Sequence, residues 1–312
     1  GGSESNNLAI KGVLLLDKKK NHIVTTKIEH PAVLRTCQTL EEDGFSFTYL
    51  NVDKDGLIDP KELEKAITSK TALVSIMHAN NEIGVVQELK KIVEICKKKK
   101  VLFHTDAVQS FTKVDLDVKE IPVDLVSISA HKIHGPKGVG ALFIRKGVEL
   151  KKQNQGGHQE FDLRAGTENI PGIVGFAKAV ELANDKHVAQ MEKLRDYFIS
   201  KVLKEIPDTF LNGSLKKRLC NNINISFRFI EGEGLLLHLD ANGIAVSTGS
   251  ACTSQSLEPS HVLLAIGLKH EDAHGAIRFT LSRFTTKDEL DYTLRKLKEA
   301  VENLRKISPL VK

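Results

Sequence analysis

Short apolar runs of strand length alternate with helical patterns along the first half of the chain. The runs that we predict to be strands are residues 22–28, 45–50, 71–77, 101–104, 123–129 and 139–145. Within residues 88–100, apolar side chains recur at the three- and four-residue spacing of a helix, at Leu89, Ile92, Val93 and Cys96. Short apolar strands separated by helices indicate an α/β fold with a parallel sheet that is covered on both faces.

The second half of the chain has a different pattern. We expect a long helical region over residues 172–205, followed by strand-like runs at 221–229 and 276–282 and a final helix. This succession is typical of a smaller α+β domain. We therefore predict a large domain over residues 1–188 and a small C-terminal domain over residues 189–312, divided inside the long helix.

The composition narrows the classes of function. The chain has 312 residues, of which 41% are hydrophobic, enough for a substantial core. The net charge of +5 is mildly basic and no aromatic residues interleave with the lysine runs, so the pattern argues against direct nucleic-acid binding. No apolar run reaches the length that spans a membrane. The four cysteines form no CxxC pair, which argues against a zinc site or disulfide framework and favours a reducing compartment such as the cytoplasm.

Polar and ionisable residues gather at the ends of three predicted strands. They are Asn80 and Asn81 after the third strand, His104, Asp106, Gln109 and Ser110 at the fourth, and Ser129, His131, Lys132 and His134 at the fifth. The carboxyl ends of parallel strands meet at one edge of a sheet, where ligands bind in open α/β folds. Taken singly, Asp106 is equally well explained as a helix N-cap, and a histidine as a structural residue. Together, the three strand ends predict a ligand site.

Lys132 has the most specific chemistry in this group. It directly follows a buried strand, lies between two histidines and precedes a Gly-Pro-Lys-Gly turn. We expect a lysine held in such a pocket to lose part of its hydration, which favours the free amine that attacks a carbonyl carbon. Lys132 is therefore a candidate for a Schiff base with an aldehyde cofactor such as pyridoxal phosphate.

An aldehyde cofactor at Lys132 gives roles to its neighbours. Pyridoxal phosphate needs a carboxylate beside its pyridine nitrogen, a donor to its phenolic oxygen, a flat partner for its ring and a helix start for its phosphate. Asp106 is the candidate for the pyridine nitrogen, and Gln109 or Asn81 for the phenolic oxygen. His30 or His104 could stack on the ring. We expect a helix at the start of the chain, where Gly2 and Ser3 are the candidates for binding the phosphate.

Stretches spread over almost the whole chain resemble one family. They are "GGSESNNLAIKG", "EHPAVLRTC", "MHANNEIGVVQ", "HTDAVQS", "SAHKIHGPKGVGALFIRKG", "LRAGTENIPGIVGF", "VSTGSACTSQSLEPSHVL" and "AIRFTLSRFTT". In these stretches the chain resembles the pyridoxal-phosphate-dependent cysteine desulfurases of the NifS/IscS type, in the class V aminotransferase superfamily. The resemblance implies fold type I, in which a large domain with a mainly parallel, seven-stranded-type sheet carries a smaller α+β domain.

The resemblance also implies a role for each matching residue. Lys132 would form the Schiff base, and His30 would stack on the ring and relay protons. Asp106 would contact the pyridine nitrogen, and Gln109 and Asn81 would lie near the ring. The phosphate would be bound by Gly2, Ser3, Ser129 and His131. Thr167 would reach the phosphate of the cofactor in the partner subunit, which implies a homodimer. Asn81 and Arg278 would bind the substrate carboxylate, and Cys252 would accept the sulfur. His104 also matches the family, without an assigned role.

The implied reaction converts L-cysteine to L-alanine. The sulfur would form a persulfide on Cys252. The sequence around Cys252 resembles the long-loop branch of the family. The persulfide sulfur would then pass to acceptor proteins for Fe–S cluster assembly and tRNA thiolation. No intrinsic metal is expected, and Cys252 is a candidate transient Fe–S ligand together with a scaffold protein. Two alternatives stay open: a selenocysteine lyase-like enzyme, which would not need the Cys252 segment in this form, and a catalytically impaired fragment that only binds.

Two departures from the family pattern are visible. The family begins earlier and ends later than this chain, so we expect an N-terminally incomplete chain with consequences for activity and dimerisation. "GGHQEFDLRAGT" replaces a version richer in glycine and arginine, so we expect an altered phosphate contact or loop order around His158, Phe161 and Asp162. The remaining cysteines are Cys37 and Cys96, which we expect to be structural at apolar helical positions, and Cys220, which precedes a strand and fits either role.

Overall fold

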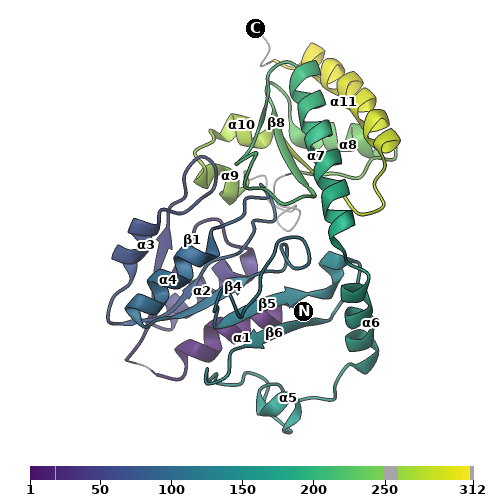
Figure 1. Cartoon of the computed structure of the whole chain (residues 1–312). Coiled ribbons are helices and arrows are strands. Elements are labelled where there is room, and N and C mark those ends of the chain that lie inside the picture. Colours follow the sequence, from purple (N-terminus) through teal and green to yellow (C-terminus); the bar gives the residue numbers. More distant parts are fainter. Residues whose placement is uncertain (18, 249–258, 310–312) are drawn as a thin grey trace. The chain divides into compact units, whose positions relative to one another are not determined.

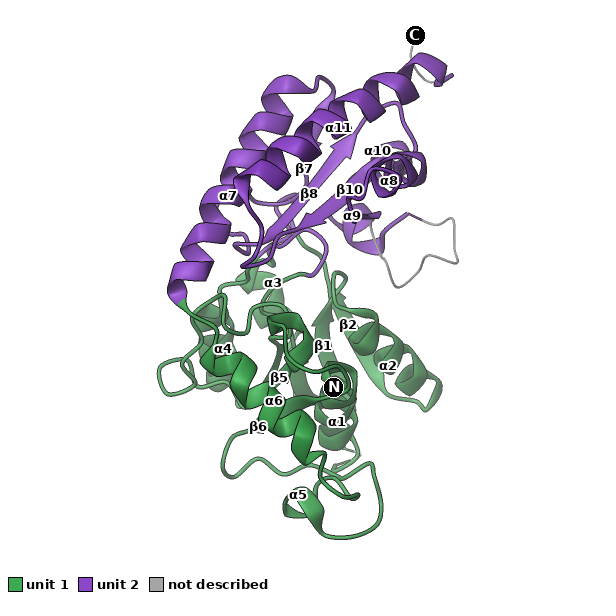
Figure 2. Ribbon diagram, turned by 90° about the vertical axis from the view of Figure 1, so that its right-hand side faces the viewer, with its two compact units in different colours: residues 1–52, 58–80, 86–184 green, residues 53–57, 81–85, 185–312 purple. Residues whose placement is uncertain are grey.

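The computed structural model describes residues 1–17, 19–248 and 259–309 (Figure 1). The chain divides into two compact units, which are green and purple in Figure 2. The first unit comprises Gly1–Val52, Ile58–Asn80 and Val86–Asn184, and the second comprises Asp53–Leu57, Asn81–Val85 and Asp185–Lys312. Two short segments from the first half of the chain therefore belong to the second unit, which the pattern of strands and helices did not predict.

The first unit contains a mainly parallel sheet, which has six strands within the described residues. Its strands are β1 (His22–Thr26), β2 (Ser46–Leu50), β3 (Thr71–Ser75), β4 (Leu102–Asp106), β5 (Leu125–Ser129) and β6 (Gly140–Ile144). In space they follow the order β2-β1-β3-β4-β5-β6, and every neighbouring pair is parallel except β5 and β6. The predicted α/β fold is confirmed, with β6 as an antiparallel strand at one edge.

Helices cover both faces of this sheet (Figure 1). The helices of the first unit are α1 (Gly2–Leu14), α2 (Pro31–Glu42), α3 (Pro60–Ala66), α4 (Leu89–Lys99), the one-turn 3₁₀ helix η1 (Ala130–Ile133), α5 (Gln159–Asp162) and α6 (Ile170–Glu181). One core lies under α1 and α2, and a second lies under α3 and α4. Successive strand residues supply both cores because they point to opposite faces: Leu125 joins the first core and Val126 the second.

The helical region predicted over residues 172–205 is interrupted. It forms two helices, α6 (Ile170–Glu181) and α7 (Asp185–Glu205), separated by three residues that end at Asn184. Asparagine favours helix boundaries because its side chain competes for backbone hydrogen bonds, and Asp185 complements the helix dipole in the first turn of α7. The first unit ends and the main part of the second begins at this break.

The second unit is an α+β structure with a core of its own. Its strands form an antiparallel sheet in the order β7-β8-β10-β9: β7 (Thr209–Leu211), β8 (Asn222–Phe227), β10 (Ala276–Thr280) and β9 (Ser247–Thr248). Its helices are α7, α8 (Gly232–Asp240), α9 (His261–Ala265), α10 (His270–His274) and α11 (Lys287–Ile307). Phe198, Leu239 and Leu297 join α7, α8 and α11 to this sheet. No helix among the described residues has both the length and the apolar character of a membrane span.

Candidate active site

Asp106 ends strand β4 and is buried at the carboxyl edge of the first unit's sheet. The side chain of Asn6 in α1 donates from Nδ2 to Asp106 Oδ2 at 2.7 Å, and the Val108 N–H donates to Oδ1 at 2.9 Å. Burial raises the pKa of Asp106, and these two hydrogen bonds and the charges of His30 and Lys132 oppose the rise. The carboxylate is thus oriented by two donors and lies within electrostatic reach of two basic side chains.

Lys132 lies in η1, the single helical turn that directly follows β5. This turn buries Ala130 and Ile133 in a small core with Phe176 of α6, whereas Lys132 is exposed. The expectation that Lys132 is desolvated in a pocket is therefore not met in the described part of the chain, because a one-turn helix can bury only one of its sides. Lys113 bridges this turn to the β4 end, donating from Nζ to the carbonyl of Gln109 at 2.9 Å and to that of Lys132 at 3.3 Å.

His30 is the N-cap of α2 and is half-buried. Its Nδ1 accepts the N–H of Ala32 at 3.0 Å, so the proton of the neutral ring is on Nε2. The preceding residue, Glu29, is fully buried and accepts hydrogen bonds from Thr26 Oγ1 at 2.7 Å and from the Met77 N–H at 3.0 Å. Burial raises the pKa of Glu29 to about 8. Glu29 thereby joins the loop that carries His30 to the end of β3.

The start of α1 lies against the ends of the neighbouring strands. A Cβ atom added at Gly2 would come within 2.7 Å of Val108 Cγ2 and 3.5 Å of Ser129 Cβ, so only a glycine allows this approach. Ser129 Oγ is hydrogen-bonded to His131 Nδ1 at 2.7 Å. Helix N–H groups, a hydroxyl and an imidazole are the donor set that binds a phosphate. With Lys132 and Asp106 in the same unit, these residues fit pyridoxal phosphate.

His104 has a structural role in the sheet. It is fully buried, with Nδ1 hydrogen-bonded to Ser75 Oγ at 2.8 Å and Nε2 to Ser127 Oγ at 2.9 Å. Its ring therefore links β3, β4 and β5 and has no nitrogen left for a ligand. Burial lowers the pKa of His104 to about 3. Of the two histidines considered for the ring of the cofactor, His30 is the one that remains.

We expect His104→Ala to lower the free energy of unfolding by about 3 kcal/mol at pH 8, because Ser75 and Ser127 lose their partner and a cavity forms. This loss should shrink below pH 6.5, by up to about 1.4 kcal/mol per pH unit, because only the unfolded wild-type chain then binds a proton at His104. Urea unfolding of both proteins at pH 8, 6 and 5 measures the difference. A difference that stays constant over this range contradicts a buried neutral imidazole.

The remaining predicted residues are distributed as follows. Asn81 and Arg278 lie together in the second unit, where Arg278 Nη1 donates to the Asn81 carbonyl at 3.0 Å. In the first unit, Gln109 is half-buried in the turn after β4, and Ser3 and Thr167 are exposed. Cys252 lies outside the described residues.

Comparison with known proteins places this site in a family. The family described as aminotransferase class-V matches residues 1–293. A cysteine desulfurase IscS of Dictyoglomus turgidum is 55% identical over 313 residues, which cover 99% of this chain and 79% of the relative. The chain belongs to the cysteine desulfurases of the class-V aminotransferase family.

Solved structures of similar proteins agree with this assignment. A NifS-like protein superposes on the chain with a TM-score of 0.90 at 41% identity, over 97% of this chain and 81% of that one. A structure of SspA in complex with cysteine gives a TM-score of 0.80 at 39% identity, over 92% and 81% of the two chains. The predicted α/β architecture therefore matches solved structures of related proteins.

The described cysteines of this desulfurase chain are all buried: Cys37, Cys96 and Cys220. Burial raises the pKa of both Cys37 and Cys96 to about 12. These two thiols stay protonated at neutral pH and are poor nucleophiles, as expected for structural cysteines. Burial also favours the structural reading of Cys220, which the sequence left open.

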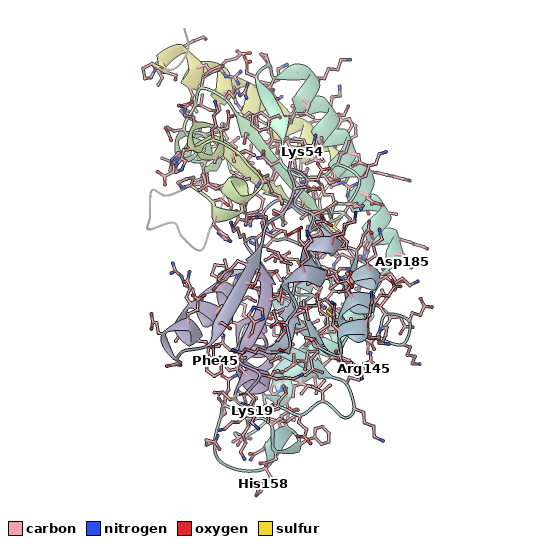
Figure 3. The ribbon with its side chains drawn as sticks, turned by 90° about the vertical axis from the view of Figure 1, so that its left-hand side faces the viewer. Lys19, Phe45, Lys54, Arg145, His158 and Asp185 are labelled. Atoms are coloured by element: carbon pink, nitrogen blue, oxygen red, sulfur yellow. The ribbon has the colours of Figure 1, made fainter. Side chains whose placement is uncertain are left out.

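The segment that departs from the desulfurase pattern lies at the surface, where Figure 3 labels His158. Asp162 Oδ1 accepts from Lys152 Nζ at 2.6 Å and lies 3.1 Å from His158 Nδ1, and Phe161 is 94% exposed. Glu160, Phe161 and Asp162 have φ values of 48°, 57° and 64°. This left-handed region favours glycine, so a glycine-rich version of the segment would take up the same backbone with less strain.

Sequence reasoning missed two residues of this site. Asn6 orients Asp106, and Glu29 fixes the loop of His30. A signal for Asn6 was present, because it lies three and four residues before Ala9 and Ile10 and so falls on the buried face of α1. A polar residue on the apolar face of a helix requires a buried partner. Glu29 had no comparable signal.

Proposed function

We propose that this desulfurase converts L-cysteine to L-alanine with pyridoxal phosphate as its cofactor and Cys252 as its sulfur acceptor. The observation that carries the proposal is the grouping of Asp106, His30 and Lys132 at one edge of the first unit's sheet, beside the start of α1. The structure of SspA with cysteine supports an amino-acid substrate of this kind.

The first unit supplies all but one of the residues that would hold the cofactor, and Asn81 of the second unit is the exception. Lys132 would form the covalent link, Asp106 would face the pyridine nitrogen, and His30 would stack on the ring. Gly2, Ser3, Ser129 and His131 would bind the phosphate, with Gln109 and Asn81 near the ring and Thr167 reaching the partner subunit's cofactor. When bound, pyridoxal phosphate withdraws electrons from the α-carbon of an attached amino acid.

The protein residues would then perform the proton and sulfur transfers. Asp106 would keep the proton on the pyridine nitrogen, and the amine of Lys132 would accept the α-proton of L-cysteine. The Cys252 thiolate would attack the substrate sulfur, so that a Cys252 Sγ–S bond forms and the substrate Cβ–S bond breaks. The balance is L-cysteine plus a thiol giving L-alanine plus a persulfide. Arg278 and Asn81 would bind the substrate carboxylate, a task that suits the planar guanidinium.

We propose that the chain works as a homodimer in a reducing compartment such as the cytoplasm. An apolar face of α6 is exposed, with Ile170 at 58%, Val174 at 62% and Ile173 at 43%. Contiguous apolar surface of this kind is typical of protein interfaces. The free thiols of Cys37 and Cys96 suit a reducing environment. The persulfide would pass to an Fe–S scaffold or to proteins of tRNA thiolation.

Product analysis tests the proposed function. We expect the chain, incubated with pyridoxal phosphate, L-cysteine and dithiothreitol, to release alanine and sulfide in equal amounts. Omitting L-cysteine gives the control. Turnover of L-selenocysteine in the absence of any turnover of L-cysteine would favour the lyase alternative, and turnover of neither would contradict an active enzyme.

A further inference from the structure

Glu82 is a buried carboxyl group of the second unit that the proposed reaction does not use. It lies in the short segment Asn81–Val85 and is 1% exposed. Its carbonyl oxygen accepts two side-chain hydrogen bonds from β8, from Asn222 Nδ2 at 3.0 Å and from Asn224 Nδ2 at 3.1 Å. Both asparagines are buried, so the segment is fixed to the sheet of the second unit at this residue.

The side chain of Glu82 is oriented by Ser260, the N-cap of α9. Ser260 Oγ accepts the N–H groups of Val262 at 3.1 Å and Leu263 at 3.3 Å, and it donates to Glu82 Oε2. Because the two backbone donors occupy the lone pairs of this oxygen, the hydroxyl proton points to the carboxyl group. Ser260 therefore fixes which way the carboxyl group of Glu82 faces.

Arg278 of β10 interacts with the same short segment. Its Nη1 donates to the carbonyl of Asn81, the residue before Glu82, at 3.0 Å. Burial raises the pKa of Glu82, while Ser260, His261 and Arg278 lower it, so the guanidinium lies within electrostatic reach of the carboxyl group. The Asn81 carbonyl, on the segment that Glu82 anchors, thus holds Nη1 of the guanidinium, and the buried carboxyl group attracts its charge.

We propose that Glu82 and Ser260 are positioning residues that hold Arg278 in the orientation that receives the substrate carboxylate. The proposal rests on the proposed function, which assigns Arg278 to that carboxylate. Bidentate binding of a carboxylate requires a fixed guanidinium plane, and an unrestrained arginine side chain has many rotamers. Partners behind metal-ligating residues supply this kind of restraint in metal sites, where their loss typically costs about 10–100-fold in affinity or activity.

Two single substitutions test this positioning role. Glu82→Gln keeps the shape and removes the charge, and Ser260→Ala removes the orienting hydroxyl. We expect each to raise the KM for L-cysteine about tenfold and to change kcat by less than about threefold, because an oriented Arg278 contributes to binding before and during the reaction alike. Ser260→Thr keeps a hydroxyl at the N-cap and should restore the wild-type KM. Calorimetric titration with L-alanine, which carries the same carboxylate, should show the same loss of affinity without turnover.

The background of Arg278→Ala separates positioning from general destabilisation. If Glu82 and Ser260 act through Arg278, their substitutions should have no further effect on KM in this background. The Thr286–Glu289 capping box of α11 is a matched control, because it pairs the same two chemical groups at the start of another helix of the second unit. Thr286→Ala and Glu289→Gln should lower stability without changing KM.

The outcomes distinguish the positioning role from the proposed function. A wild-type chain that forms no alanine from L-cysteine contradicts the proposed function itself. A wild-type chain that turns over while Glu82→Gln and Ser260→Ala keep its KM overturns the positioning role alone. The same holds if both variants raise KM equally in the presence and absence of Arg278, because their effect would then not pass through the guanidinium.

Discussion

Lys132→Ala should abolish alanine formation, with a loss of at least about 10³-fold, because one change removes both the covalent link to the cofactor and the base for the α-proton. The absorption band of the covalently attached cofactor should disappear as well. Borohydride reduction followed by mass spectrometry measures the link directly: the cofactor mass should be on the peptide that contains Lys132 in the wild type and on no peptide in the variant.

Lys137→Ala is the matched control for this prediction. Lys137 is also exposed and lies in the Gly-Pro-Lys-Gly turn just after Lys132, so its substitution removes a neighbouring positive charge without removing the proposed link. It should keep the absorption band and most of the activity. Reduced cofactor found on a different lysine in Lys132→Ala, with turnover retained, would show that the Schiff-base assignment is wrong.

The sequence pattern predicts strands β1, β3, β4 and β5 of the first unit well because burial on both faces makes each of them a short apolar run. Leu125 and Val126 are both buried, in different cores, and a run of such residues has few alternatives to a central strand. The pattern does not carry strand direction, so the antiparallel pairing of β6 with β5 could not be predicted from it. Nor does it show that residues 53–57 and 81–85 belong to the second unit, because that depends on contacts with distant residues.

In the candidate site, too, local sequence predicts some residues, whereas contacts between distant residues could not be predicted. Asp106 and Lys132 could be predicted because they lie at or just after the carboxyl ends of parallel strands, and these ends meet at one edge of the sheet. The residues that support Asp106 and Arg278 could not be predicted, because the hydrogen-bonded partners are far apart in the chain: Asn6 and Asp106 are separated by 100 positions, and Glu82 and Ser260 by 178. The exposure of Lys132 was also missed, because the sequence does not tell which side of a one-turn helix is buried.

Cys252→Ser should retain the cofactor and bind L-cysteine, but it should release no sulfide and form alanine at least about 10³-fold more slowly. A serine hydroxyl stays protonated at neutral pH and does not attack sulfur as a thiolate does. Mass spectrometry after brief treatment with L-cysteine tests the intermediate: the wild-type peptide that contains Cys252 should gain one sulfur atom, and the serine peptide should gain none.

The burial of the other described cysteines leaves Cys252 as the expected sulfur acceptor. Because the pKa values of Cys37 and Cys96 are raised to about 12, neither supplies a thiolate at neutral pH that could replace Cys252. Cys37→Ala and Cys96→Ala should therefore still accumulate the sulfur adduct on Cys252, with only a loss of stability from the cavity. Sustained sulfide release by Cys252→Ser would require another acceptor, and an adduct on Cys220 in that variant would identify it. Without such an adduct, the only thiol that fits the sulfur-transfer step is the one in the sequence "STGSACTSQSLEPS".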